Sequence, residues 1–297
     1  MSAEDLQDKV FEKDEWLVES LIPKGLSLLV GDSKIGKSFL ALQLSIAVAA
    51  GEMFLGSYDV NPGIVLYVTW EDGAQRIQKR IKKSGGMGPK NLLFNFNPNI
   101  NGKDLSWLDE WLDYKPDTRL LVLDTLAYLR TETRSRNDAY IKDVKFMEPF
   151  HTKSSDRKLS IIGVTHTNQL FKTTDHIQKI QGSTGQPGTA DNIIFLTRES
   201  RSSENGLLRI SGRDIEEKTV SLQFDRETCV WSAVEAAPTD LSISDRILSF
   251  MIEQPLSLTP KQISEALGIV NVKPQLGRLL KKGKLEKLEV GAYRAVG

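Results

Sequence analysis

The chain has 297 residues, of which 40% are hydrophobic and 26% charged, as in a globular protein with room for one large domain and a small one. Lysine and arginine together number 39, and so do aspartate and glutamate. No net charge therefore attracts the whole molecule to nucleic acid or membrane, and any such partner must be met by a local patch. The single cysteine, Cys229, excludes an internal disulfide and a cysteine zinc cluster, which suits a reducing compartment.

Residues 1–20 form an acidic segment. The first 19 residues contain seven acidic residues and two lysines, the opposite of a secretory signal, so we expect a cytoplasmic protein. We predict a short helix or arm here, which packs on its own domain or on a neighbouring subunit. The longest apolar run, residues 39–50, is too short to span a bilayer, so we expect no membrane partner.

A glycine-rich loop follows the first predicted strand, residues 26–30. It matches the spacing G-x-x-x-x-G-K-[ST], and a buried apolar helix is predicted after it over residues 37–50. Such a loop points successive backbone N–H groups at an anion, and the helix N-terminus adds partial positive charge. We predict that the loop binds ATP, with Lys37 reaching the β- and γ-phosphates and Ser38 holding Mg²⁺. The predicted nucleotide-binding residues are Gly31, Asp32, Ser33, Lys34, Ile35, Gly36, Lys37, Ser38 and Phe39.

Strands and helices alternate as far as about residue 166. Further strands are predicted at 64–69, 92–94, 119–124 and 159–165, and helices at 74–83, 105–114 and 138–151. Continuous apolar strands that alternate with helices favour right-handed βαβ units and a mostly parallel sheet. Three more strands, at 192–197, 207–211 and 219–224, are typical of a closing β-meander. The fold class is therefore α/β.

A boundary is predicted at Pro238-Thr239-Asp240. Beyond it lie predicted helices at 244–253, 259–267 and 272–282 and a predicted hairpin at 285–296. Three helices with a two-stranded wing indicate a small winged helix-turn-helix domain. The predicted organisation is an acidic arm (1–20), an ATPase domain (21–236) and a winged-helix domain (240–297).

Charged residues follow four of the predicted strands where each strand ends. Ligands bind at the carboxyl ends of strands in open α/β sheets, so these residues are candidates for the site. Asp124 holds the Walker B position and is predicted to bind Mg²⁺ together with Ser38. Glu71 is the candidate general base that activates water, and Asp72 is either that base or a helix cap. His166 is the candidate sensor of the γ-phosphate.

Four segments of the sequence resemble those of a known family. They are Gly-Asp-Ser-Lys-Ile-Gly-Lys-Ser-Phe-Leu-Ala-Leu, Leu-Tyr-Val-Thr-Trp-Glu-Asp, Leu-Val-Leu-Asp-Thr-Leu and Gly-Val-Thr-His. Together they resemble the RecA-like P-loop ATPases, and within these the RepA-type hexameric replicative helicases of plasmids and phages. The resemblance covers about residues 15–232, and ring recombinases and clock ATPases share the same motifs. It implies that Glu71 is the catalytic glutamate, Asp124 the Walker B aspartate and His166 the sensor histidine.

The same resemblance implies functional roles for two arginines. Arg80, which we also predict to bind the nucleotide, matches an arginine in the helix after the catalytic glutamate. The alternative is a solvated charge beside other basic residues of that helix. Arg213 resembles the finger by which one subunit completes the site of the next. RepA proteins instead place their finger just after Asp-Asn-Ile, where this chain has Ile194, so Lys218 and Arg198 remain alternatives.

Two polar segments, residues 130–137 and 168–181, match the positions of the DNA-gripping loops of such rings, which hold single strands through the charge of the DNA backbone. Residues 271–297 add seven basic residues against two acidic ones, and Arg278, Lys281 and Lys282 are among those on the predicted recognition helix. We predict single-stranded DNA as partner, and duplex DNA or a replication protein as partner of the winged helix. The predicted DNA contacts are Arg130, Arg134, Arg136, Lys172, Lys179, Arg278, Lys281 and Lys282.

The predicted function is a Mg-ATP-hydrolysing ring, with a hexamer expected, that moves on single-stranded DNA as a replicative helicase of a mobile element. One alternative is a DNA-binding ATPase without helicase activity, such as a helicase loader or recombination accessory. A second is a regulatory ATPase whose winged helix reads duplex DNA.

Overall fold

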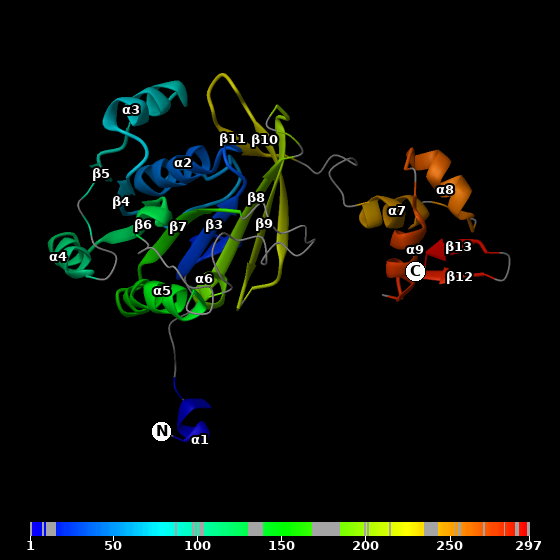
Figure 1. The fold of residues 1–297 in the computed structure, drawn as a ribbon, viewed down its shortest axis with the longest axis horizontal. Coiled ribbons are helices and arrows are strands. Elements are labelled where there is room, and N and C mark those ends of the chain that lie inside the picture. Colours follow the sequence, from blue (N-terminus) through cyan, green and yellow to red (C-terminus); the bar gives the residue numbers. More distant parts are fainter. Residues whose placement is uncertain are drawn as a thin grey trace. The chain divides into compact units, whose positions relative to one another are not determined.

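The computed structural model describes residues 2–7, 9, 16–86, 88–96, 98, 100, 104–129, 139–167, 185–198, 200, 202–213, 215–234, 243–252, 254, 257–269, 271–281, 283–288 and 291–295. Among them the chain forms two compact units, residues 1–233 and 234–297, which are described separately (Figure 1). None of the described helices is long and apolar enough to cross a bilayer.

A nine-stranded sheet organises the larger unit, in the order β11-β10-β9-β8-β3-β7-β6-β4-β5. Strands β8 to β5 in that order run parallel, whereas β9, β10 and β11 return antiparallel to their neighbours. The strands are β3 (Leu26–Gly31), β4 (Ile64–Thr69), β5 (Leu92–Phe96), β6 (Thr118–Asp124), β7 (Ser160–His166), β8 (Asn192–Arg198), β9 (Asn205–Gly212), β10 (Lys218–Phe224) and β11 (Trp231–Ala233).

Both faces of this sheet are covered, because its strands are apolar on both sides. In β6, Leu120 and Val122 belong to one buried cluster with the apolar side chains of α2, and Leu121 and Leu123 belong to a second with those of α4 and α5. Figure 1 shows α2 and α5 on opposite sides of the sheet. The helices are α2 (Lys37–Ala50), α3 (Ala74–Lys83), α4 (Ser106–Tyr114), the 3-10 turn η1 (Leu126–Leu129), α5 (Ala139–Asp156) and α6 (Gly185–Thr189).

The registers bring four strand ends to one edge of the sheet. Gly31 at the end of β3 lies opposite His166 at the end of β7, and Asp124 at the end of β6 lies opposite Thr69 at the end of β4. Parallel strands must end at the same edge, so the loops that follow them converge there. This edge is called the carboxyl edge below.

The smaller unit contains α7 (Ile243–Ile252), α8 (Pro260–Leu267), α9 (Lys273–Lys281) and the antiparallel pair β12 (Leu285–Lys287) and β13 (Tyr293–Ala295). A buried cluster that includes Ile247, Ile263 and Leu276 joins the three helices. Thr259 begins α8 with a capping box, in which its hydroxyl accepts from the Gln262 amide and the Gln262 side chain accepts from the Thr259 amide.

The N-terminal segment packs in part on its own domain, which is one of the two arrangements expected for residues 1–20. Helix α1 (Ala3–Gln7) is present, but Trp16–Val18 form strand β1, which pairs with β2 (Ile22–Pro23). Leu17 and Val18 are buried in the core cluster that includes α2. Their apolar character therefore reflects the core of the larger unit, and any arm ends before Trp16.

Candidate nucleotide-binding site

The phosphate-binding loop connects β3 to α2 at the carboxyl edge. Gly36 precedes the helix with φ 108°, a left-handed conformation that favours glycine, and Lys34 also has a positive φ of 65°. A Cβ on Gly36 would lie 3.1 Å from the Trp231 ring, so close packing disfavours a side chain here as well. These left-handed residues give the loop a tight curl, and a loop of this kind can present its backbone amides to an anion.

Lys37 is buried beneath this loop, with 4% of its surface exposed. Its Nζ donates to the carbonyl oxygens of Gly31 and Asp32, both at 2.8 Å, and lies 3.1 Å from Nδ1 of His166. The hydroxyl of Thr167 donates to the Asp32 carboxylate, which ties the end of β7 to the loop. The contact of Lys37 with His166 brings together two residues predicted separately from the sequence.

Burial lowers the pKa of the Lys37 ammonium to about 8, although Asp124, Asp32 and Glu71 oppose this shift. Burial and the Lys37 charge also lower the pKa of His166, so this imidazole is neutral at pH 7. A bound triphosphate places negative charge beside Lys37 and must raise its pKa again. Nucleotide binding is therefore linked to protonation of Lys37.

This linkage predicts a pH-dependent nucleotide affinity. Below pH 8 Lys37 is protonated in the free protein, and its titration leaves the affinity unchanged. Above pH 8 binding must take up a proton, so the affinity falls by up to about tenfold per pH unit. Calorimetric titration from about one pH unit below that pKa to about one unit above it, in buffers of different ionisation enthalpy, measures both the affinity and the proton uptake. The weak affinity of Lys37→Ala should lack this pH dependence, and a flat wild-type profile would contradict the linkage.

Asp124 ends β6 and is buried, with 3% exposed. Its Oδ2 accepts a hydrogen bond of 2.7 Å from the Tyr67 hydroxyl, and its carboxylate also accepts one from Ser38. Burial raises the pKa of Asp124, whereas the hydrogen bonds from Tyr67 and Ser38 lower it. The two predicted metal ligands, Ser38 and Asp124, therefore lie in contact. Tyr67, which orients the carboxylate, was not predicted because nothing in the sequence links it to Asp124.

Glu71 and Asp72, the two candidates for the general base, differ in their surroundings. Glu71 is exposed, and the pKa of its carboxyl is raised by partial desolvation and by Asp124 and Asp72 against the opposing charge of Lys37. The Asp72 carboxylate is buried and pairs with Arg76 at 2.8 Å and with Arg80. The cap of α3 is Gly73, without a side-chain cap bond. Asp72 therefore anchors α3, and Glu71 is the carboxylate available to a water molecule.

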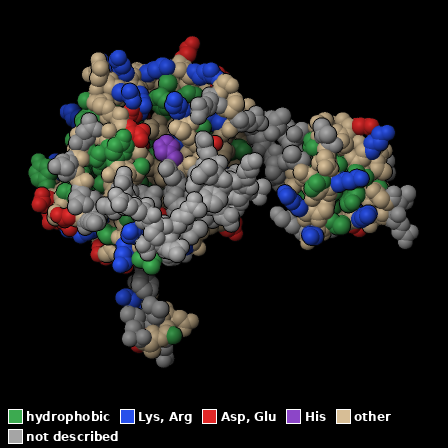
Figure 2. Space-filling view, in the orientation of Figure 1, with side chains coloured by type: hydrophobic (Ala, Val, Ile, Leu, Met, Phe, Trp, Pro, Cys, Tyr) green, Lys and Arg blue, Asp and Glu red, His purple; other side chains and the backbone are tan. Residues whose placement is uncertain are grey.

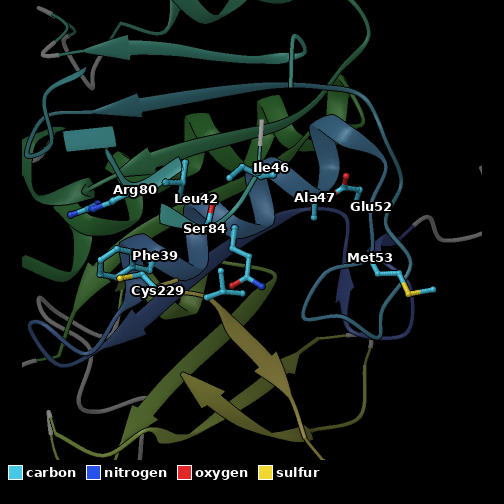
Figure 3. Close-up of a pocket in the computed structure, with 12 residues that line it drawn as sticks. Phe39, Leu42, Ile46, Ala47, Glu52, Met53, Arg80, Ser84 and Cys229 are labelled. Carbon is cyan, nitrogen blue, oxygen red and sulfur yellow. The ribbon is translucent and has the colours of Figure 1, made fainter. Parts of the chain in front are cut away.

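Arg80 lies on the side of α3 that faces α2. Besides its ion pair with Asp72, its guanidinium stands 4.7 Å from the centre of the Phe39 ring, and its side chain is 18% exposed. These contacts are those of an anchored arginine and not of a solvated helix-face charge. Both residues line a groove between α2, α3 and the turn before β11, together with Met53 and Cys229 (Figure 3).

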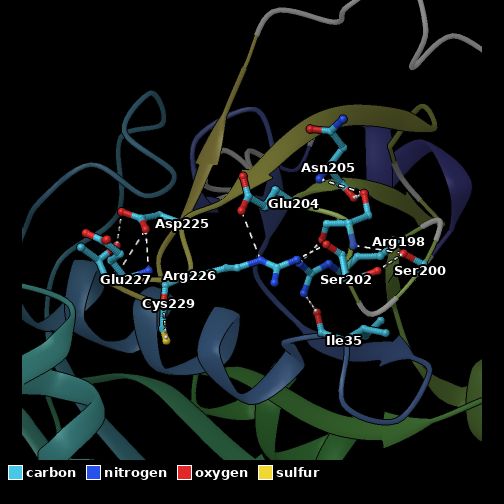
Figure 4. A network of polar contacts seen from close by, with 12 residues as sticks. Ile35, Arg198, Ser200, Ser202, Glu204, Asn205, Asp225, Arg226, Glu227 and Cys229 are labelled. Atoms are coloured by element: carbon cyan, nitrogen blue, oxygen red, sulfur yellow. Dashed lines mark hydrogen bonds and ion pairs between the residues drawn. The ribbon is translucent and has the colours of Figure 1, made fainter.

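Arg198, one alternative for the finger, contacts the loop of its own chain. It ends β8, and its Nη1 donates to the Ile35 carbonyl at 3.3 Å, while Nη2 donates to the carbonyl of Ser203 (Figure 4). Its guanidinium stacks 4.8 Å from the Phe224 ring and 5.1 Å from the Trp231 ring. Arg198 therefore supports the phosphate-binding loop from the strand beside it.

Trp231 is a second support of the loop, and sequence reasoning missed it. Its backbone N–H and C=O bond the side-chain amide of Gln43 in α2 at 2.9 and 2.7 Å, and its indole Nε1 donates to the Gly36 carbonyl at 3.4 Å. The polar Gln43 inside an apolar helix was the available signal, because a half-buried amide in apolar surroundings needs hydrogen-bond partners.

Arg213 lies at the opposite edge of the sheet from its own loop. Gly212 pairs with Asn192 at the start of β8, beside the start of β3. The loop begins five residues further along β3, about 16 Å away at about 3.3 Å per residue. Lys218 begins β10 near this same edge and donates to the Ser20 carbonyl at 3.0 Å.

The predicted DNA-contacting residues are only partly described. Arg130, Arg134, Arg136, Lys172, Lys179 and Lys282 lie outside the described residues. Arg278 and Lys281 are exposed on α9, and Figure 2 shows basic and apolar side chains mixed on the visible face of the smaller unit.

A curled loop with a buried lysine, a strand-end aspartate in contact with the loop serine, and a parallel sheet define the class of P-loop ATPases. Residues 1–170 of the 297 match the family model AAA_25, described as an AAA domain. The match spans more than half of the chain, so the chain belongs to this family. The class implies nucleotide binding with a divalent metal.

Two solved structures share the fold. One, whose title describes it as an "ATPase Domain", matches with a TM-score of 0.57 and 16% identity over 71% of this chain and 85% of that one. "The Structure Of A DnaB-Like Replicative Helicase And Its Interactions With Primase" matches with the same score and identity over 71% of this chain and 57% of that one. At this identity the likeness establishes the fold alone and not the activity.

Proposed function

We propose that the protein is a Mg-ATP-hydrolysing ring motor, a hexamer by this proposal, that moves on single-stranded DNA as a replicative helicase of a plasmid, phage or other mobile element. The observation that carries the ATPase part is the convergence of Lys37, Asp124, Glu71 and His166 at one sheet edge. The helicase part is supported by the fold shared with a solved ATPase domain and with a DnaB-like replicative helicase.

The donor set fits a hard divalent cation. The Ser38 hydroxyl and the Asp124 carboxylate are oxygen ligands, and they already lie in hydrogen-bond contact. When bound, Mg²⁺ would neutralise the negative charge of the phosphate oxygens. In this proposal Lys37 leaves the carbonyls of Gly31 and Asp32 and binds the phosphate oxygens.

Glu71 accepts the proton of the attacking water in the proposed hydrolysis. The water oxygen bonds to the γ-phosphorus, the bond to the β-phosphate oxygen breaks, and ADP carries away that electron pair. The raised pKa of Glu71 makes its carboxylate a better proton acceptor than an ordinary glutamate. His166 is proposed to respond to the γ-phosphate, and its contact with Lys37 supports this role.

Arg213 is proposed as the finger that completes the site of a neighbouring copy. It stands at the sheet edge opposite its own loop, so it cannot serve its own nucleotide. Lys218 lies near that edge as well, but it is half-buried beside a tyrosine ring 5.1 Å away, whereas Arg213 is exposed. We therefore favour Arg213 over Lys218, and over Arg198, which contacts its own loop.

We further propose that the smaller unit is a winged helix-turn-helix. Three helices and a hairpin form it, and Arg278 and Lys281 on α9 pair with no acidic side chain among the described residues. Exposed cations on such a helix suit phosphate contacts. The acidic arm and the two loops predicted to grip DNA remain part of the proposal.

The proposal is tested by ATP hydrolysis measured over a range of protein concentrations. A finger in trans predicts that specific activity rises steeply with concentration and rises again with single-stranded DNA. Light scattering should show a larger particle with ATP and DNA, and a forked duplex should be unwound. Flat specific activity without a DNA response would contradict the ring motor.

Hydrolysis stimulated by DNA without strand displacement would instead favour a loader or recombination accessory. Tight, sequence-dependent duplex binding with slow turnover would favour the regulatory ATPase, which the exposed cations of α9 also suit.

A further inference from the structure

Asp191 lies at the centre of a polar cluster at the edge of the sheet opposite the phosphate-binding loop. Its Oδ2 accepts from the Leu26 amide at 2.9 Å, which fixes the carboxylate to the start of β3. Its Oδ1 lies 3.0 Å from Nε2 of His151 in α5 and 3.8 Å from Nη1 of Arg213. A carboxylate only accepts, so Nε2 of His151 carries the proton. The proposed mechanism of hydrolysis uses neither Asp191 nor His151.

The chain approaches this carboxylate closely. Gly25 has φ +120°, and a Cβ there would lie 2.7 Å from Oδ2 of Asp191. The backbone N–H of Arg213 donates to the Asp191 carbonyl at 3.1 Å. Asp191 therefore holds Arg213 through both its main chain and its side chain.

Arg213 is further held by the end of α6. Its Nη2 donates to the carbonyls of Gly188 at 2.9 Å and Thr189 at 3.3 Å. Its side chain is nevertheless 51% exposed, so part of the guanidinium faces outward. An arginine anchored at one side and open at the other is pre-organised to meet an anion brought by another molecule.

We propose that Asp191 is a positioning residue for Arg213, and that it aligns this guanidinium toward the nucleotide of a neighbouring copy, with His151 orienting the carboxylate. The inference rests on the proposed function, because it takes Arg213 as the finger. Asp191 touches neither nucleotide nor water in this scheme and acts through Arg213 alone.

The test mixes Asp191→Asn with Lys37→Ala protein. A ring of Asp191→Asn alone has intact loops but misaligned fingers, so its turnover should fall about 10- to 100-fold, part of the roughly 10³- to 10⁵-fold that a finger contributes. Its nucleotide affinity should not change. Lys37→Ala brings intact fingers but no working loop, so mixing the two impaired proteins should raise hydrolysis at their shared sites above that of either protein alone. Asp109→Asn, which removes a carboxylate paired with Lys153 elsewhere, is the matched control and should leave turnover unchanged.

Two more variants separate positioning from a structural role. Adding Asp191→Asn to Arg213→Ala should cause no further loss of turnover, because both changes remove the same group from the site. His151→Leu keeps the carboxylate and its bond to Leu26, and should give a smaller loss that mixing also restores. His151→Leu therefore also tests the positioning role if Asp191→Asn does not fold.

The outcomes distinguish this inference from the function on which it rests. If Arg213→Ala is not restored by Lys37→Ala, or is fully active, Arg213 is not a finger and the proposed ring mechanism fails. If Arg213→Ala is restored, but Asp191→Asn and His151→Leu either keep full turnover or are not restored, the finger stands and the positioning role of Asp191 is overturned.

Discussion

Replacing Glu71 by glutamine is expected to lower the turnover of ATP by about 10²- to 10⁴-fold, the contribution typical of a positioned general base. The amide keeps the size of the side chain but cannot take a proton from water. Nucleotide affinity should stay within a few-fold of wild type, because Glu71 is exposed and makes no hydrogen bond to the loop among the described residues. Steady-state hydrolysis and the binding of a fluorescent ATP analogue measure the two effects separately.

Glu110→Gln, which changes an exposed glutamate of α4, is the matched control and should alter neither turnover nor nucleotide affinity. Asp72→Asn separates the two candidate bases. Because Asp72 pairs with Arg76 and Arg80, its loss should loosen α3 and lower the thermal unfolding temperature more than it lowers turnover. Full activity of Glu71→Gln, with an inactive Asp72→Asn that still binds nucleotide, would transfer the role of base to Asp72.

Lys37→Ala is expected to weaken nucleotide binding about 10- to 100-fold, since a hydrogen bond to a charged group contributes about 1.5–3 kcal/mol. Turnover should fall further, by about 10²- to 10³-fold, as when a donor to the transition state is removed. The reason is that Lys37 is the buried cation at the base of the loop, held 2.8 Å from two carbonyl oxygens. Equilibrium binding and single-turnover hydrolysis report the two losses.

Lys82→Ala, which removes an exposed lysine of α3, should change neither quantity. Thermal unfolding without nucleotide shows whether Lys37→Ala is folded, and addition of ATP should stabilise it less than wild type. Unchanged affinity together with unchanged turnover in Lys37→Ala would refute the ATP site itself.

Much of the larger unit was predictable because its signals are local. The helices Lys37–Ala50 and Ala74–Lys83 and the strand Ile64–Thr69 have the predicted bounds, since a glycine, a proline-glycine pair or a change of apolar period marks each end. The strand-end positions of Asp124 and His166 were predictable for the same reason. Parallel strands share one carboxyl edge, so their last residues had to meet.

The residues that the sequence did not reveal make contacts between distant parts of the chain. Trp231 supports the loop from 195 residues away, and Arg198 reaches Ile35 across 163. The apolar residues Trp16–Val18 resemble an arm in isolation, and only the sheet core shows that they belong to β1.

The amino-acid sequence alone determines that this chain has a phosphate-binding loop on an α/β sheet and which acids follow the strands. The tertiary structure determined which role each of those residues can have. The Asp72 carboxylate forms ion pairs with two arginines that lie four and eight residues further along the chain. Glu71 forms no such pair among the described residues, so its carboxylate is available to a water molecule. The antiparallel return of β9 places Arg213 at the edge away from its own loop, because reversing a strand exchanges its ends and sequence spacing does not record that reversal.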